Sequence, residues 1–165
     1  MNARELQDAV CKDLEQLFRG DSFQMAEGGG APGKVRAFKQ NLPRIEAENE
    51  ETLFPFIIVR VDSGKIASPT EAHRVRLLLW AGVCDDSPEN NGHLGVLEIL
   101  ERIQQHYQES PALGPAVVAD PFEWALQDEE SFPFFYGGCY VDFDLPAPRS
   151  VLPLARDAED WRQFT

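Results

Sequence analysis

The pattern that decides the fold of this chain lies in the stretch Phe132-Pro-Phe-Phe-Tyr-Gly-Gly-Cys-Tyr-Val-Asp-Phe-Asp-Leu-Pro-Ala-Pro148. From Cys139 to Leu145, apolar side chains occupy every second position. Successive side chains of a strand point to opposite faces, so this period of two predicts a strand with one buried face. The glycine pair before it permits a bulge or a close backbone approach, and the prolines after it end the strand because they lack an N–H donor.

Composition places the chain among single-domain globular proteins. Its 165 residues suit one domain, and 43% hydrophobic and 26% charged residues are ordinary for such a fold. No apolar run approaches the ~20 residues of a membrane span, so no membrane role is expected. The 28 acidic residues outnumber the 15 basic ones, and the net charge of −13 disfavours attraction to polyphosphate. An acidic wall would nevertheless suit a channel through which DNA slides without being held.

The cysteines Cys11, Cys84 and Cys139 are odd in number and widely spaced, without a Cys-x-x-Cys pair. This spacing predicts neither a disulfide framework nor a zinc site. We expect small, buried thiols in a reducing compartment, and therefore synthesis in the cytoplasm.

Apolar periodicity predicts two principal helices, at residues 3–19 and 93–108, because each segment carries a single apolar stripe. The β-branched run 53–61 predicts a strand covered on both faces, and the link Asp62-Ser-Gly-Lys65 predicts a turn after it. The alternation at 74–83 predicts another strand, whose second face is polar at one end and apolar at the other. Such a face suits a sheet whose back is half covered by a helix or completed by a partner chain. The prediction is an α+β fold: a mainly antiparallel sheet of about four strands packed against two helices, with extended loops or arms.

Two segments outside these elements have the composition of arms. Residues 26–51 join a glycine-rich loop to a run that changes from basic to acidic, and residues 149–165 place two aromatic residues in a polar tail. The candidate interface residues are Lys34, Arg36, Lys39, Arg44, Glu46, Glu48, Glu50, Glu51, Trp161 and Phe164. The charged run is typical of a solvated connection, or of an arm that pairs with a complementary patch on a neighbouring subunit. We predict one domain at 1–148, which includes the 26–51 loop, and a tail at 149–165 that is either an assembly arm or disordered decoration.

Residue combinations that carry catalysis are weak in this sequence. Asp85, Asp86, Glu89 and His93 lack the spacing of a calcium loop and a partner histidine, so a solvated acidic loop before a helix explains them better. No Ser, Cys or His occurs in a recognisable nucleophile motif. We therefore predict no enzyme activity, no metal and no cofactor.

Two further groupings leave other interpretations open. Trp80, Trp124 and Phe134 can form a ligand pocket, although aromatic residues in strands usually belong to the core. Asp142 and Asp144 share one strand face, as the paired carboxylates of a hydrolase would, although carboxylates on a solvated face are usually not catalytic.

A series of apolar and aromatic motifs runs in order along the chain. They are Glu5-Leu-Gln-Asp-Ala-Val10, Phe38-Lys-Gln-Asn-Leu-Pro43, Phe54-Pro-Phe-Ile-Ile-Val-Arg60, Val75-Arg-Leu-Leu-Leu-Trp80, Val96-Leu-Glu-Ile-Leu-Glu-Arg-Ile103, Pro121-Phe-Glu-Trp-Ala-Leu126 and Phe132-Pro-Phe-Phe-Tyr136, followed by the strand to Pro148. In this order they resemble the tail-completion, or tail-terminator, proteins of tailed phages and prophages. The resemblance covers about residues 3–148 and leaves the C-terminal tail outside it.

The resemblance implies a small α/β subunit that forms a ring, typically a hexamer, at the head-proximal end of the tail tube. Its implied partners are further copies of itself, the tail tube protein and the head-tail connector protein. DNA would pass through the ring without sequence-specific binding. The implied location is the tail or neck of the virion, after assembly in the host cytoplasm. A head-tail connector or neck protein is the near alternative, and a small-molecule-binding regulatory domain is a more distant one.

Overall fold

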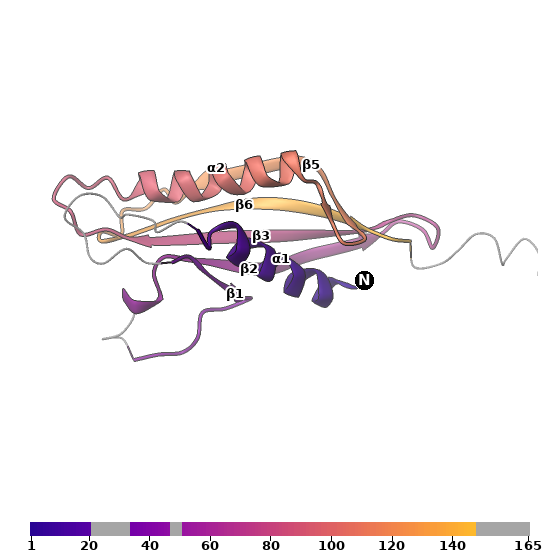
Figure 1. Ribbon diagram of the computed structural model, residues 1–165, viewed down its shortest axis with the longest axis horizontal. Helices are drawn as coiled ribbons and strands as arrows, with labels where there is room; N and C mark the ends of the chain where they lie inside the picture. Colours follow the sequence, from indigo (N-terminus) through magenta and orange to yellow (C-terminus); the bar gives the residue numbers. More distant parts are fainter. Residues whose placement is uncertain (21–33, 47–50, 148–165) are drawn as a thin grey trace, which may run out of the picture.

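The computed structural model describes residues 1–20, 34–46 and 51–147 (Figure 1). These residues form two helices, α1 (Ala3–Leu17) and α2 (His93–Glu109), and six strands. The strands are β1 (Arg36–Lys39), β2 (Phe56–Ile66), β3 (His73–Cys84), β4 (Ala112–Leu113), β5 (Ala116–Leu126) and β6 (Phe134–Leu145). The α+β class predicted from the sequence is confirmed.

The strands form one sheet in the order β1-β2-β3-β6-β5-β4. β1 pairs with β2 in parallel, and every other pairing is antiparallel. The prediction of about four strands was wrong because three strands lack a clear alternating pattern. β1 and β4 have four and two residues, too few for a period to be read. In β5, the register against β6 shifts between Ala119 and Glu123, which breaks the alternation.

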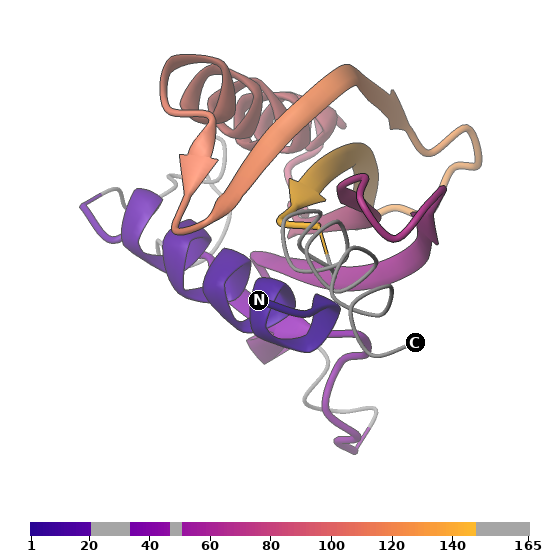
Figure 2. The ribbon, with the colours of Figure 1, turned by 90° about the vertical axis from the view of Figure 1, so that its right-hand side faces the viewer.

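The main core lies between the helices and one face of the sheet (Figure 2). α1 contributes Leu6, Val10 and Leu14, the stripe that the sequence predicts, and the Asn2 side chain accepts a hydrogen bond of 2.9 Å from the Glu5 amide at its start. The buried residues of α2 are Val96, Ile99, Leu100, Ile103 and Tyr107. Among the described residues, no helix is long and apolar enough to span a bilayer.

The predicted turn at residues 62–65 was wrong. β2 continues to Ile66, with a shift in register between Val61 and Ser63, and Gly64 lies opposite Val75 in β3. Polar residues with turn propensity are held in extended form here because the ladder with β3 supplies backbone hydrogen bonds for the whole hairpin. At the other end of β2, residues Phe56 to Val59 are buried, as expected for a strand covered on both faces.

The glycine pair in β6 marks a close approach rather than a bulge, because its pairing with β3 is continuous. A Cβ atom on Gly137 would lie 2.7 Å from Cγ1 of Val96 in α2. On the opposite face, a Cβ atom on Gly138 would lie 2.8 Å from Cε3 of Trp80. The two glycines therefore let a helix and an indole ring pack directly on the strand backbone.

Candidate interaction surface

The second face of the sheet points away from α1 and α2. We call this the open face, and it consists of side chains from β2, β3 and β6: Phe56, Ile58, Arg74, Arg76, Leu78, Trp80, Tyr136, Tyr140, Asp142 and Asp144. It is charged at the end where β3 begins and aromatic at the other end, as the sequence predicts. Within the described residues no helix covers it, and the chain around Phe38, Leu42, Leu53 and Phe54 packs on the aromatic end.

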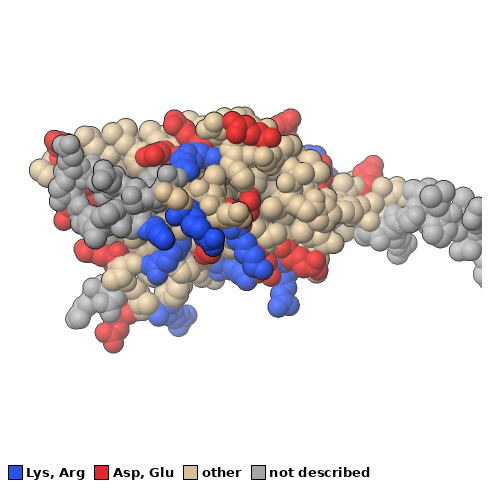
Figure 3. Space-filling model, in the orientation of Figure 1, with Lys and Arg blue, Asp and Glu red and all other residues tan. Residues whose placement is uncertain are grey.

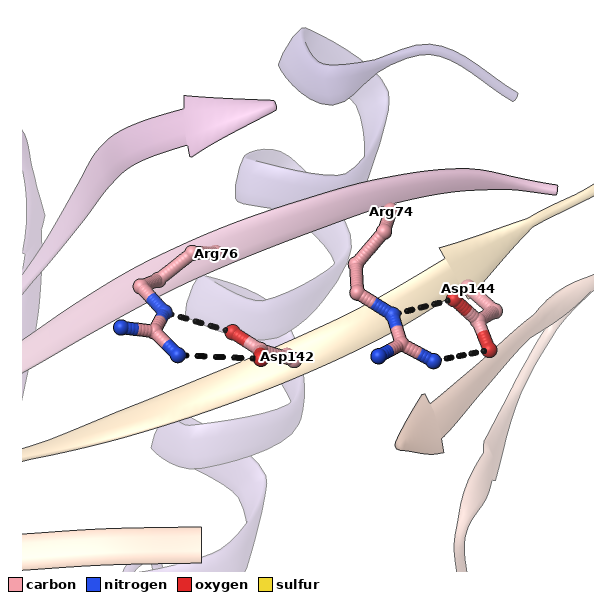
Figure 4. Close-up of polar contacts among 4 residues, drawn as sticks. All are labelled: Arg74, Arg76, Asp142 and Asp144. Carbon is pink, nitrogen blue, oxygen red and sulfur yellow. Dashed lines mark hydrogen bonds and ion pairs between the residues drawn. The ribbon is translucent and has the colours of Figure 1, made fainter. Parts of the chain in front are cut away.

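Two arginine–aspartate pairs occupy the charged end of the open face (Figure 4). Arg74 donates to both carboxylate oxygens of Asp144 at 3.0 and 3.2 Å. Arg76 does the same to Asp142 at 2.9 and 3.3 Å. Each hydrogen bond to a carboxylate raises the pKa of its guanidinium. In Figure 4, helix α1 lies behind the strands that carry these side chains, which places the pairs on the face opposite the main core.

These pairs bear on the hydrolase interpretation of Asp142 and Asp144. The two carboxylates share a face, as predicted, but each is directly opposite its arginine in the register of β3 and β6. The side chain of Asp142 is only 6% exposed, and the Arg76 guanidinium also lies 5.1 Å from the centre of the Tyr140 ring. Because both oxygens of each carboxylate accept hydrogen bonds from a guanidinium, the pairs act as cross-links between strands and hold their register.

A pocket of about 460 Å³ opens at the aromatic end of this face. We call it the aromatic pocket, and its lining residues are Leu42, Pro43, Arg44, Ile45, Leu53, Phe54, Phe134 and Tyr136. The rings of Phe54 and Phe134 stack with centroids 4.9 Å apart, and Tyr136 stacks on Trp80 at 6.0 Å. Its walls thus come from segments that precede β2 and begin β6.

The structure separates the predicted aromatic trio. Phe134 lines the aromatic pocket, and Trp80 is joined to it through Tyr136. Trp124 is 52% exposed and lies opposite Cys139 in β5, on the helix side of the sheet. The sequence analysis did not predict that Leu42, Leu53 and Phe54 lie beside Phe134. The only signal that could have linked the two segments is the Phe-Pro pair that both contain, Phe54-Pro55 and Phe132-Pro133.

The structure describes only some residues of the predicted interface. The described members, Lys34, Arg36, Lys39, Arg44, Glu46 and Glu51, are all exposed, whereas Glu48, Glu50, Trp161 and Phe164 lie outside the described residues. Arg36 and Lys39 belong to strand β1, so this part of the arm is a strand of the sheet. Arg44 lines the aromatic pocket.

Contacts hold the basic residues of β1 against their neighbours. Lys39 forms an ion pair with Asp8 of α1, which raises the pKa of Lys39 and lowers that of Asp8 through their hydrogen bond. Arg36 donates to the carbonyl of Thr52 and lies 5.5 Å from the centre of the Phe38 ring. In Figure 3, Lys and Arg side chains gather along the region of α1, with Asp and Glu side chains around them. The chain therefore presents a local basic surface despite its acidic net charge.

The acidic loop before α2 has a structural explanation. Asp85 is buried and accepts a hydrogen bond of 2.9 Å from the Ser87 amide, which stabilises the turn. Among the described residues, no three His, Cys, Asp or Glu side chains are grouped as metal ligands would be. The three cysteines are free thiols, with Cys11 and Cys139 buried and Cys84 partly exposed.

No protein-family model matches the chain, and no curated protein matches it.

Proposed function

We propose that this protein is a structural virion subunit that caps or completes a phage tail tube and joins it to the head-tail connector. It acts by assembling into a ring of its own copies, a hexamer, without catalysis, metal or cofactor. The proposal combines the order of motifs along the chain with one structural observation, the open face of the sheet.

The open face supports an assembly role because of what it exposes. Both helices lie on one side of the sheet, and on the other side the described chain packs only on the aromatic end. The rest of that side is left to solvent or to a partner. Here that side carries an aromatic pocket and cross-strand ion pairs that keep it rigid. Aromatic and arginine side chains are enriched at protein interfaces, and a rigid surface loses little entropy when a partner binds.

The remaining partners follow from the same proposal. One side of the ring contacts the tail tube protein and the other the head-tail connector protein. The net charge of −13 is compatible with DNA passing through the ring without sequence-specific binding. The subunit is made in the host cytoplasm and ends in the tail or neck of the virion.

Negative-stain microscopy and the mass of the purified protein in solution test this function. We expect closed rings and a mass near six subunits. A monomer at every concentration, with no ring and no effect on tail completion, would contradict the proposal. So would turnover of an ester, phosphoester or peptide that a single Asp or His substitution abolishes.

Two variants test whether the segments outside the sheet carry assembly. Deletion of residues 149–165, or reversal of Glu46, Glu48, Glu50 and Glu51 to Lys, should leave a folded subunit that forms few rings. A matched control reverses four exposed acids elsewhere, Glu71, Glu98, Glu101 and Glu129. If both variants form rings and complete tails as the unaltered protein does, the assembly contacts lie on the sheet or helices instead.

Two other functions compete with this one. A head-tail connector or neck protein would also form a ring, but it would bind on the head side of the junction rather than to the tail tube. A small-molecule-binding regulatory domain is favoured by one observation, since about 460 Å³ lies within the usual volume of ligand pockets. A monomer whose thermal stability rises with a metabolite would support that function.

A further inference from the structure

We infer that the aromatic pocket binds the C-terminal tail of a neighbouring copy, with Trp161 and Phe164 as the inserted side chains. This inference rests on the proposed function, because it requires copies to lie side by side in a ring. It adds to that function the place where the tail binds, and it makes each copy the donor of a tail to one neighbour and the acceptor of a tail from the other.

The chemistry of the aromatic pocket fits aromatic anchors. Stacked Phe54 and Phe134 form one wall, and Leu53 and Tyr136 add apolar surface. Ile45, at the rim, is 40% exposed although it is a large apolar residue. Trp and Phe side chains prefer offset or edge contacts with other rings, and a pocket of this volume is large enough for two such groups.

The position of the chain's end favours a neighbour as the donor. β6 begins at Phe134, in the pocket, and runs to Leu145 at the opposite end of the sheet (Figure 1). At about 3.3 Å per residue, these two residues lie about 36 Å apart. The chain therefore leaves the sheet while heading away from its own pocket, and would have to reverse to reach it.

The length of the tail is sufficient to reach the next subunit. An extended chain covers about 3.3–3.6 Å per residue, so the stretch from Pro146 to Trp161 spans up to about 55 Å. A donor at one end of the subunit and a receptor at the other make a head-to-tail contact, which closes into a ring when repeated by rotation. Because the tail begins at one end of the subunit and the aromatic pocket lies at the other, every copy in a ring can make the same contact with the next.

Charge complements the apolar contact. Asp157, Glu159 and Asp160 lie just before Trp161, between Arg156 and Arg162, and they outnumber these two arginines. Arg44 lines the pocket that would receive the indole ring. An acidic segment next to the anchor and an arginine at the rim favour the correct direction of entry.

Cysteine cross-linking between full-length chains tests the inference. One chain carries Ile45→Cys at the pocket rim, and the other carries Gln163→Cys between the two anchors, both with Cys84→Ser to remove the partly exposed native thiol. After the two chains are mixed in equal amounts and mildly oxidised, we expect disulfide-linked pairs made of one chain of each kind. Random placement around a ring brings the two cysteines together at about a quarter of the contacts, so up to about half of the chains are joined. The matched control replaces Ile45→Cys with Lys12→Cys, an exposed site on α1 at the helix side, and should give only background.

The outcomes separate this inference from the proposed function. Rings with the expected cross-link support both, and rings without it overturn the tail contact while leaving the ring intact. A monomer without the cross-link overturns both. A single chain that carries both cysteines gives a further control: if its disulfide forms only within the chain, the pocket binds its own tail and the contact between copies is refuted. As a second readout, Arg44→Glu should lower ring yield and Arg44→Glu with Asp160→Arg should restore it. If the double variant does no better than the single one, the charge contact is refuted.

Discussion

Replacing Leu79 with alanine tests which face of β3 is buried. Leu79 is 0% exposed and lies between Val59 of β2 and Cys139 of β6, under the helices. Leucine-to-alanine changes in cores of this kind lower the free energy of unfolding by about 2–5 kcal/mol, because they remove apolar contacts and leave a cavity. We expect Leu79→Ala to fall within that range.

Urea denaturation followed by circular dichroism measures this loss. With a slope of about 2 kcal/mol per molar urea, the midpoint should fall by about 1–2.5 M. The matched control is Leu94→Ala in α2, where the side chain is 56% exposed, and its free energy of unfolding should change by less than about 0.5 kcal/mol. Leu79→Asp and Val141→Asp place a carboxyl group in the same core and should prevent stable folding, since burial of an unpaired polar group adds several kcal/mol to the lost contacts.

An unchanged midpoint for Leu79→Ala would refute the assignment of faces. A shift of one residue in the register of β3 would turn Leu78 towards the helices and Leu79 towards the open face. In that case Leu78→Ala, rather than Leu79→Ala, would show the large loss.

Two other predictions concern packing and the thiols. Gly137→Ala should lower the free energy of unfolding by about 1–3 kcal/mol because its Cβ would overlap a side chain of α2. Gly20→Ala, whose Cβ would have no atom of the described residues within 4 Å, should be nearly neutral in the same urea assay. Burial raises the pKa of Cys11 to about 11 and that of Cys139 to about 12, so iodoacetamide at pH 8 should label Cys84 first in mass spectra of the native protein. The folded state keeps these two protons, whereas an unfolded thiol loses its proton near the ordinary pKa of 9.0. Their contribution to stability is therefore complete below pH 9 and is lost as the pH rises through the folded pKa values, about 11 for Cys11 and about 12 for Cys139. Rapid labelling of Cys139 in the folded protein, or a melting temperature that rises from pH 9 to pH 11, would contradict the burial of these thiols.

Local patterns in the sequence determine several elements of this protein by themselves. The alternation from Cys139 to Leu145 predicts the buried face of β6 correctly, and the stripe in residues 3–19 predicts α1. The change from charged to apolar residues along β3 predicts the two ends of the open face. These predictions succeed because strand and helix periods follow from backbone geometry within a few residues.

The tertiary structure alone decides which distant segments meet. Arg76 and Asp142 are 66 residues apart, and no local pattern pairs them. The aromatic pocket likewise joins Leu42 and Phe54 to Phe134 across the end of the sheet. β5 escapes prediction because a shift in its register interrupts the period, and the turn expected at residues 62–65 gives way to pairing with β3. In each case the sheet's long-range hydrogen bonds and packing outweigh the preferences of a short segment, and those contacts have no signature within a single stretch of sequence.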